Sequence, residues 1–248
     1  MRKSLLNFSK HLLRDSISIL YYNLYKRFLN TRGNRSLIYH AFGLKLKHDT
    51  YGISIDINNF KEHMKYVHNN HKVIALKNYA KYDVDSVSIT IDDGYKDTIS
   101  AVDILNTYNV PFNLFITTNN IDTKNYLSSQ DIRDISTLDI ANIGSHGCSH
   151  RKLAELNPDE QSFEINQSKK ILQDIIGGKI FSYSYPHGSY DDTTLNIIKL
   201  SGYDYAASSI KGKNDKYVSQ YVLCRNEIIS SDKISDISKK IKGYYDYY

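Results

Sequence analysis

The sequence predicts an α/β fold: a parallel sheet whose strands alternate with crossover helices, in seven or eight units that could close into a barrel. Short apolar runs alternate along almost the whole chain of 248 residues with longer segments that carry apolar residues at helical spacing. No repeat, linker or low-complexity stretch interrupts this alternation. In such a fold the functional groups lie where strands end and loops begin.

Eight short segments have the apolar or alternating composition of buried strands. The first of them, RSLIYHAFG, ends at Gly43, and the fifth stops at Gly144. Several unusual polar residues stand at the ends of these segments. The segments comprise residues 35–43, 72–76, 87–91, 111–118, 139–146, 179–186, 203–209 and 221–228.

Helices are expected between these strands. Asn58 or Asn59 can cap the first helix, whose apolar face includes Phe60, Met64 and Val67. The longest helix, at 158–176, ends at two glycines, which are a common C-terminal stop. The others are expected at 97–108, 128–138 and 191–202, and a short helix with a frayed tail at 239–248.

Residues 1–34 are expected to form an N-terminal amphipathic helical extension to a single domain that spans 35–248. Their apolar stretch is far shorter than the roughly 20 residues of a membrane-spanning helix, and no cleavage site of a secretory signal follows it. Leu13, Ile17, Leu20, Leu24 and Phe28 recur at helical spacing, so this stripe either packs on the body of the protein or lies on a membrane surface. The lack of a signal favours a cytoplasmic protein, with membrane contact as the alternative.

Composition excludes several classes of protein. With 41% hydrophobic and 24% charged residues the chain is expected to fold rather than to be disordered. The net charge of +5 comes from scattered lysines, and no nucleic-acid motif accompanies it. Two cysteines in a chain of this length carry no signal about the redox compartment.

Two adjacent aspartates, Asp92 and Asp93, directly follow the strand at 87–91. Adjacent carboxylates repel one another, and near a core each also loses hydration. Solvent, a cation or a catalytic role has to make the pair tolerable. The DDG sequence is therefore either an exposed turn or part of a functional site.

Two histidines, His146 and His150, stand at the end of the strand at 139–146, at a spacing that lets both reach one cation. With one carboxylate they would leave open positions on a metal, as in zinc sites with a bound water or in non-heme iron sites. If Asp93 is that carboxylate, its charge is compensated. Asp92 is then free to accept a proton from the water.

A third constellation follows the strand at 179–186. Pro186 and Gly188 around His187 favour a tight turn that exposes backbone N–H groups. Such N–H groups could hold an oxyanion, although a plain turn would have the same sequence.

The three segments TIDDGYKD, SHGCSHRKL and YSYPHGSYDD resemble, in this order and at these separations, the motifs of the polysaccharide deacetylase family, the NodB-homology carbohydrate esterases. The resemblance covers roughly residues 37–229. It implies a distorted (β/α) barrel of about seven parallel strands that hydrolyses acetyl groups on sugars with a divalent metal. It also implies that Asp92 is the general base, that Asp93, His146 and His150 are metal ligands, and that His187 offers its N–H to the oxyanion.

The chain departs from the family at two positions. Ser184 stands where most members carry an arginine that orients the base, and Arg225 is the candidate to replace it, unless it forms an exposed salt bridge. No histidine follows His187 to act as the usual C-terminal general acid. The segment LIYHAFG resembles a circularly permuted subgroup that deacetylates exopolysaccharides, which makes His40 the expected acid. His187 is the second candidate for that role, and a buried structural His40 is the alternative.

The expected function is therefore metal-dependent hydrolysis of N-acetyl groups on amino sugars of a bacterial surface polysaccharide or its lipid-linked precursor, most simply with Zn²⁺. A deformylase or other acyl-amide hydrolase, and a catalytically silent glycan-binding barrel, are the alternatives. The tail tyrosines Tyr244, Tyr245, Tyr247 and Tyr248 either stack on sugars or belong to a disordered tail.

Overall fold

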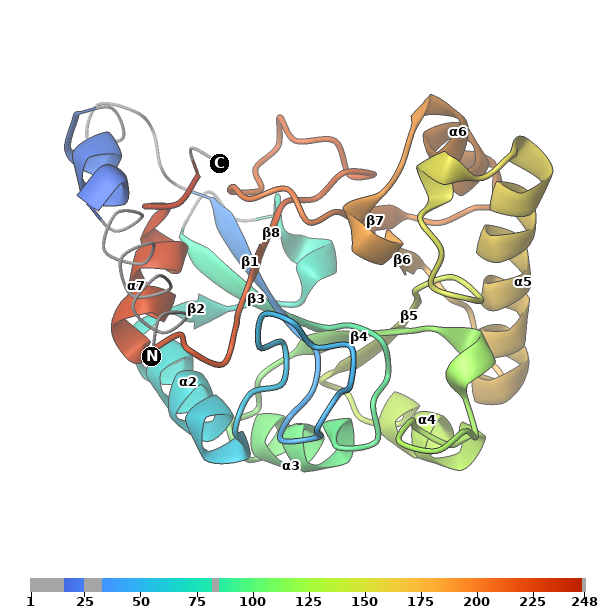
Figure 1. Cartoon of the computed structure of the whole chain (residues 1–248), viewed down its shortest axis with the longest axis horizontal. Helices are drawn as coiled ribbons and strands as arrows, with labels where there is room; N and C mark the ends of the chain where they lie inside the picture. The colour runs from blue at the N-terminus through green and yellow to red at the C-terminus, as the bar shows by residue number, and fades with distance from the viewer. Residues whose placement is uncertain (1–15, 25–32, 82–84, 247–248) are drawn as a thin grey trace.

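Strands and helices alternate around a nearly closed, distorted barrel (Figure 1). The computed structural model describes residues 16–24, 33–81 and 85–246. The strands are β1 (Asn34–Tyr39), β2 (Lys72–Val73), β3 (Ser86–Ile91), β4 (Phe112–Ile116), β5 (Ala141–Ser145), β6 (Ser182–Ser184), β7 (Tyr205–Ala207) and β8 (Arg225–Glu227). The helices are α2 (Ile57–Asn70), α3 (Thr98–Thr107), α4 (Ser129–Ser136), α5 (Pro158–Ile176), α6 (Asp192–Leu200) and α7 (Ile234–Lys242), and residues 16–24 are also helical.

Seven strands follow one another in the order β7-β6-β5-β4-β3-β1-β8, and β2 pairs with β3 beside this path. Every pairing between these strands is parallel, as the alternation with helices predicts. A parallel bridge between Ala207 and Leu223 and a hydrogen bond from the Arg225 amide to the Ile210 carbonyl (2.8 Å) connect the two ends. Among the described residues, an isolated bridge and single hydrogen bonds close the barrel in place of a continuous strand ladder.

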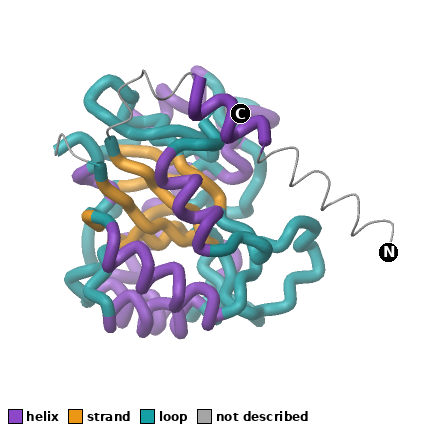
Figure 2. The backbone as a smooth tube through the Cα atoms, turned by 90° about the vertical axis from the view of Figure 1, so that its left-hand side faces the viewer, coloured by secondary structure: helices purple, strands orange, loops and turns teal. Residues whose placement is uncertain are grey.

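The helices cover the outside of the strands. Figure 1 shows α7, α2, α3, α4, α5 and α6 in an arc around the sheet, and Figure 2 shows the strands grouped inside the helices. Residues such as Leu37, Tyr39 and Ile89 pack into the main apolar core. Their neighbours Ser36 and Ser88, which oppose one another in the β1–β3 register, are equally buried but polar. Because successive side chains of a strand point to opposite faces, one face of β3 is apolar and the other carries serine and threonine side chains.

Local sequence explains most helix ends. Asn157 caps α5 in a capping box, Pro158 occupies the first turn, and Gly177 ends the helix in a left-handed conformation (φ 64°). The expected cap of α2 was wrong: the cap is Asp56, whose side chain accepts hydrogen bonds from the amides of Asn58 and Asn59. A carboxylate two positions earlier is an equally good acceptor.

The C-terminal tail is ordered up to Asp246, which corrects the expected fraying. Tyr245 is buried, Tyr244 stacks on Tyr22 with ring centroids 3.9 Å apart, and Asp246 accepts hydrogen bonds from the buried Arg35 at 2.6 Å. These contacts also rule out sugar stacking by Tyr245. Tyr247 and Tyr248 lie outside the described residues, as do Leu13 and Phe28 of the N-terminal stripe.

The described part of the N-terminal stripe does not pack on the body of the protein. Ile17, Leu20 and Leu24 are 44%, 59% and 57% exposed. The first of the two expectations for this stripe is therefore wrong for these residues. Among the described helices, none has the length and apolar character needed to cross a bilayer.

Candidate active site

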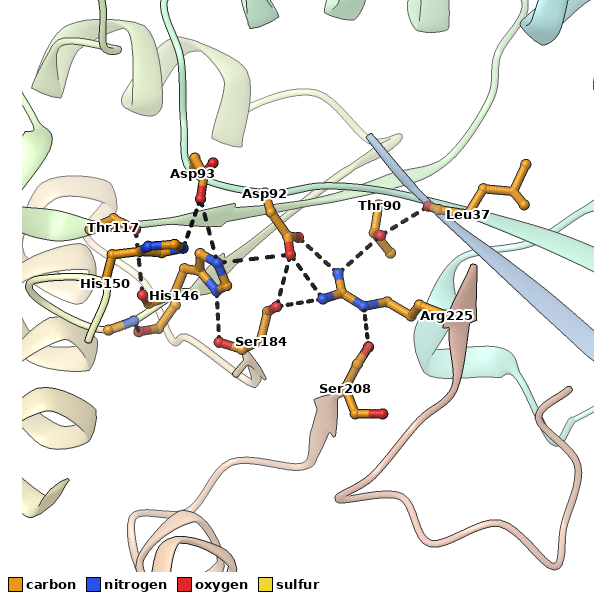
Figure 3. A network of polar contacts seen from close by, with 12 residues as sticks. Leu37, Thr90, Asp92, Asp93, Thr117, His146, His150, Ser184, Ser208 and Arg225 are labelled. Carbon is orange, nitrogen blue, oxygen red and sulfur yellow. Dashed lines mark hydrogen bonds and ion pairs between the residues drawn. The ribbon is translucent and has the colours of Figure 1, made fainter. Parts of the chain in front are cut away.

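The chemically active side chains gather at the carboxyl ends of the strands. His40 follows β1, Asp92 and Asp93 follow β3, His146 follows β5, and His187 lies in a tight turn after β6. They line, with His150, a cleft of about 610 Å³. Six of the seven residues that the sequence singled out thus share one cavity. The seventh, Arg225, lies behind it against Asp92 (Figure 3).

Arg225 forms a bidentate ion pair with Asp92. The two guanidinium NH₂ groups donate to the two carboxylate oxygens at 2.8 Å each. The other three N–H groups of Arg225 donate to Thr90 Oγ1 (3.1 Å), Ser184 Oγ (2.6 Å) and the Ser208 carbonyl (2.9 Å). All five donors are therefore used, which a side chain that is 1% exposed requires.

Ser184 completes this arrangement. Its hydroxyl donates to Asp92 Oδ2 at 3.0 Å while it accepts from Arg225. The position that holds arginine in most of the family thus holds a serine that connects Asp92 to an arginine from β8. Arg225 is buried and ion-paired with Asp92, so it is not an exposed salt bridge.

The charge of Asp92 is stabilised by this partner. Burial raises the pKa of the carboxyl, but the Arg225 guanidinium and its hydrogen bonds outweigh burial and lower the pKa below its usual range. Asp92 is therefore ionised at neutral pH. A buried carboxylate that stays charged can act as a base.

Asp93, His146 and His150 form a second, different cluster. Their ligand atoms all lie within 4.8 Å of one another, and together they could hold a metal ion. Asp93 Oδ1 is 3.5 Å from His146 Nε2 and 3.3 Å from His150 Nε2. Ligands about 2.0–2.1 Å from one tetrahedral ion would stand roughly 3.3–3.4 Å apart. The two distances fit that geometry.

The hydrogen bonding of His146 favours a cation at this point. Its Nδ1 lies 2.7 Å from the Ser184 carbonyl, which can only accept, so Nδ1 carries the hydrogen and Nε2 presents a lone pair. Burial lowers the pKa of His146 to about 4 against the opposing effect of Asp92, so the ring is neutral at pH 7. The lone pair faces Asp93 Oδ1, a buried atom without a well-aligned hydrogen bond in the described part of the chain. A positive ion would relieve this repulsion.

Three residues around the cleft have a left-handed backbone. The φ angles are 76° at Asp93, 58° at His150 and 57° at His187. Only a few percent of residues other than glycine have a positive φ, and strain of this kind concentrates at functional sites. The rings of His150 and His187 lie 4.4 Å apart, so the turn after β6 adjoins the cluster.

A buried glutamate that the sequence analysis did not identify fastens the loop between the two histidines. Glu164, on α5, accepts hydrogen bonds from the backbone of Cys148 (2.8 Å) and Ser149 (2.9 Å) and from the Ser149 hydroxyl. Gly147 has φ 76°, and a Cβ there would approach Glu164 to 3.2 Å. The loop is therefore held in the shape that directs His146 and His150 to the same point.

The loop after β1 forms another wall of the cleft that the sequence did not indicate. His48 Nε2 lies 3.0 Å from the Tyr95 hydroxyl, which joins this loop to the segment after Asp93. Asp49 accepts from several amides of its own loop, among them Tyr51 and Ile53 at 3.1 Å each. Tyr51 lines the cleft and is 70% exposed.

The protein is thus a (β/α) barrel whose strand ends carry an Asp-His-His cluster that could hold a metal, beside a buried aspartate paired with an arginine. Among such barrels, the chain belongs to the polysaccharide deacetylase family, whose model matches residues 80–206. The match contains Asp92, Asp93, His146 and His150. His40, which follows β1, and Arg225, on β8, lie outside the matched residues. In the structure β1 pairs with β3, and Arg225 forms an ion pair with Asp92.

Individual relatives agree with this assignment. The chain is 28% identical over 175 residues to the candidate polysaccharide deacetylase YxkH of Bacillus subtilis. This alignment covers 67% of the chain and about three fifths (62%) of the length of YxkH. The deacetylase PplD of Streptococcus pyogenes, solved in complex with acetate, has a TM-score of 0.75 at 18% identity over 86% of this chain and 99% of its own. A de-N-acetylase from Aggregatibacter actinomycetemcomitans has a TM-score of 0.70 at 17% identity, over 84% and 99%. The two solved structures show a shared fold.

Proposed function

We propose that the protein is a metal-dependent deacetylase that hydrolyses N-acetyl groups on amino sugars of a surface polysaccharide or its lipid-linked precursor. The observation that carries this proposal is the convergence of Asp93, His146 and His150 next to the ionised Asp92. Family membership supplies the reaction class. The solved relatives named for N-deacetylation and for an acetate complex support acetyl as the acyl group.

Asp93, His146 and His150 would hold the metal. A carboxylate and two imidazoles suit Zn²⁺, which commonly keeps a position open for catalysis when three protein ligands bind it. When bound, such an ion polarises a carbonyl and lowers the pKa of water.

Asp92 takes the role of general base. Arg225 and Ser184 fix the orientation of its carboxylate and keep it ionised, so that it can accept the proton of the water that attacks the acetyl carbonyl. Oδ2 of Asp92 lies 3.9 Å from His146 Nε2, so the base adjoins the ligand cluster.

His40 takes the role of general acid and protonates the departing amine. It follows Tyr39, whose carbonyl accepts from the Asp92 amide at 2.9 Å, and it lines the same cleft. Its Nδ1 is buried and has no hydrogen-bond partner among the described residues. The backbone N–H of His187, in its left-handed turn, would donate to the oxyanion.

The cleft is suited to a carbohydrate. Tyr51, which is 70% exposed, and the partly exposed Tyr126 line it, and its volume of about 610 Å³ lies in the usual range of ligand sites. Aromatic faces and polar groups together bind the apolar faces and hydroxyls of sugar rings.

The test uses the full chain after removal and return of Zn²⁺, with N-acetylglucosamine oligomers as substrate and mass spectrometry to detect loss of acetyl groups. The proposal predicts product from the metal-loaded protein, none from the metal-free protein, and product formed at least about 100-fold more slowly by the loaded Asp92→Asn variant. N-formylated oligomers in a parallel reaction distinguish a deformylase. Binding of oligomers without turnover and without stoichiometric metal would instead establish a glycan-binding barrel.

A further inference from the structure

The N-terminal helix at residues 16–24 turns its aliphatic side away from the protein. Ile17, Leu20 and Leu24, spaced by three and four residues, form one stripe and are 44%, 59% and 57% exposed. Ser18, on the other side of the helix, is completely buried. An amphipathic helix on a globular protein normally buries its apolar stripe in the core. Here the orientation is reversed.

The helix is nevertheless fastened to the body of the protein. The Tyr22 ring stacks on Tyr244 with centroids 3.9 Å apart and planes 5° from parallel. Tyr244 belongs to the ordered tail, whose Asp246 pairs with Arg35 at the start of β1. Figure 1 shows the helix, in blue, on the same side of the molecule as α7. The outward stripe therefore stands at a fixed place.

Positive charge is concentrated around this helix in the sequence. Residues 1–32 contain seven lysines and arginines and a single acidic residue, Asp15, which gives a net charge of +6. Since the whole chain carries +5, the remaining residues sum to −1. The charge of the protein is thus not scattered, as composition alone indicated, but belongs to the segment that contains the exposed stripe.

We propose that this stripe, defined as Ile17, Leu20 and Leu24, docks the protein on an anionic lipid membrane. An exposed apolar helix face within a basic segment is the combination that binds in the headgroup region of such membranes. A second copy of the chain is a poorer occupant. A stable protein interface buries about 800 Å² on each partner, far more than three side chains provide, and two segments of +6 would repel one another.

Attachment in this orientation leaves the cleft open. The helix is tied to the beginning of β1 through Arg35 and Asp246, whereas His40 stands at the other end of that strand. Six strand residues span roughly 20 Å. The membrane surface and the active site are therefore separate, and the docking proposal does not depend on the proposed reaction.

The test is co-sedimentation of the full chain with sucrose-loaded vesicles of phosphatidylglycerol and phosphatidylcholine in equal parts, compared with pure phosphatidylcholine. We expect binding to the anionic vesicles that weakens at high salt. Leu20→Glu and Leu24→Glu should each lower the partition coefficient by about tenfold or more, because each places a carboxylate among lipid chains.

Leu200→Glu is the matched control, since Leu200 is an 88% exposed leucine on α6, and it should bind as the wild type does. Circular dichroism and thermal unfolding verify that each variant folds. The proposal is overturned if the wild type does not bind the anionic vesicles, or if Leu20→Glu binds them unchanged. It is also overturned if light scattering shows a dimer that Leu20→Glu converts to a monomer, because a second copy then covers the stripe.

Discussion

Two adjacent carboxylates, Asp92 and Asp93, are held in opposite ways. Asp92 meets a cation that the chain itself supplies, Arg225, and both of its oxygens are bonded. Asp93 meets two imidazole nitrogens, has a left-handed backbone, and leaves Oδ1 without a well-aligned hydrogen bond in the described structure. All donors and acceptors around Asp92 are paired within the protein, whereas Asp93, His146 and His150 present the ligand atoms of a possible metal site. The difference explains how two neighbouring acids can have different tasks.

The largest expected effect comes from substitution of Asp92, the proposed general base. Asp92→Asn removes the base but leaves the ligand cluster untouched, so we expect kcat to fall by about 10²–10⁴-fold. Steady-state kinetics on N-acetylglucosamine oligomers measures the change. Wild-type-like turnover in a correctly folded Asp92→Asn protein would remove the base assignment.

Loss of the Arg225 guanidinium should lower the free energy of unfolding. Arg225→Met leaves Asp92 charged and buried without its partner, which costs about 3–5 kcal/mol. Urea denaturation of both proteins gives the difference in the free energy of unfolding. The double variant Arg225→Met/Asp92→Asn serves as the control and should recover part of the loss, because no charge is then left unpaired. Equal loss in both would show that packing of the long side chain, not charge, matters.

Metal binding by Asp93, His146 and His150 should depend on Glu164, which holds the loop between the two histidines. Glu164 touches neither the proposed ion nor Asp92, yet it holds the backbone between His146 and His150. Glu164→Gln should weaken Zn²⁺ binding by about 10–100-fold, as loss of an outer partner of a metal site typically does. Competition with a chromophoric chelator measures the affinity. Glu160→Gln, on the exposed side of the same helix, is the control and should leave the affinity unchanged.

The smallest effect is expected at the position where the chain departs from its family. Ser184→Ala removes the hydrogen bond to Asp92 and the acceptor of one Arg225 N–H but keeps the bidentate ion pair, so the free energy of unfolding should fall by about 1–3 kcal/mol. Thermal unfolding monitored by circular dichroism is sufficient for this comparison. A loss as large as that of Arg225→Met would mean that the serine, rather than the arginine, stabilises Asp92.

The sequence predicted the strand and helix alternation, and the structure contains a strand in each of the eight expected segments. It also predicted the residues of the cleft, because Asp92, Asp93, His146 and His187 stand at strand ends, and parallel strands bring those ends together. Signals of this kind depend on a few neighbouring residues, so they can be recognised in the sequence alone.

The contacts of Arg225 could not be predicted in the same way. They depend on a polar barrel interior assembled from β1, β3, β6 and β8, which are far apart in the sequence. One feature of the sequence would have identified Glu164. It falls on the buried face of α5 with Ile165 and Leu172, where an acid has to have a partner.

The ordered tail also escaped prediction, and the sequence left open whether the N-terminal stripe packs on the protein or faces outward. Tyr244 and Asp246 look like residues of a polar tail until Tyr22 and Arg35 are placed beside them. Periodicity showed that Ile17, Leu20 and Leu24 share a face, but not which way that face points.

Metal content of two neighbouring variants tests the central claim most directly. Asp92→Asn and Asp93→Asn change the same atoms one residue apart, and elemental analysis of both proteins after dialysis against Zn²⁺ gives their stoichiometry. The structure predicts about one equivalent in Asp92→Asn, as in the wild type, and a loss of the ion in Asp93→Asn. Equal metal content in the two variants would contradict the division of roles between the two carboxylates.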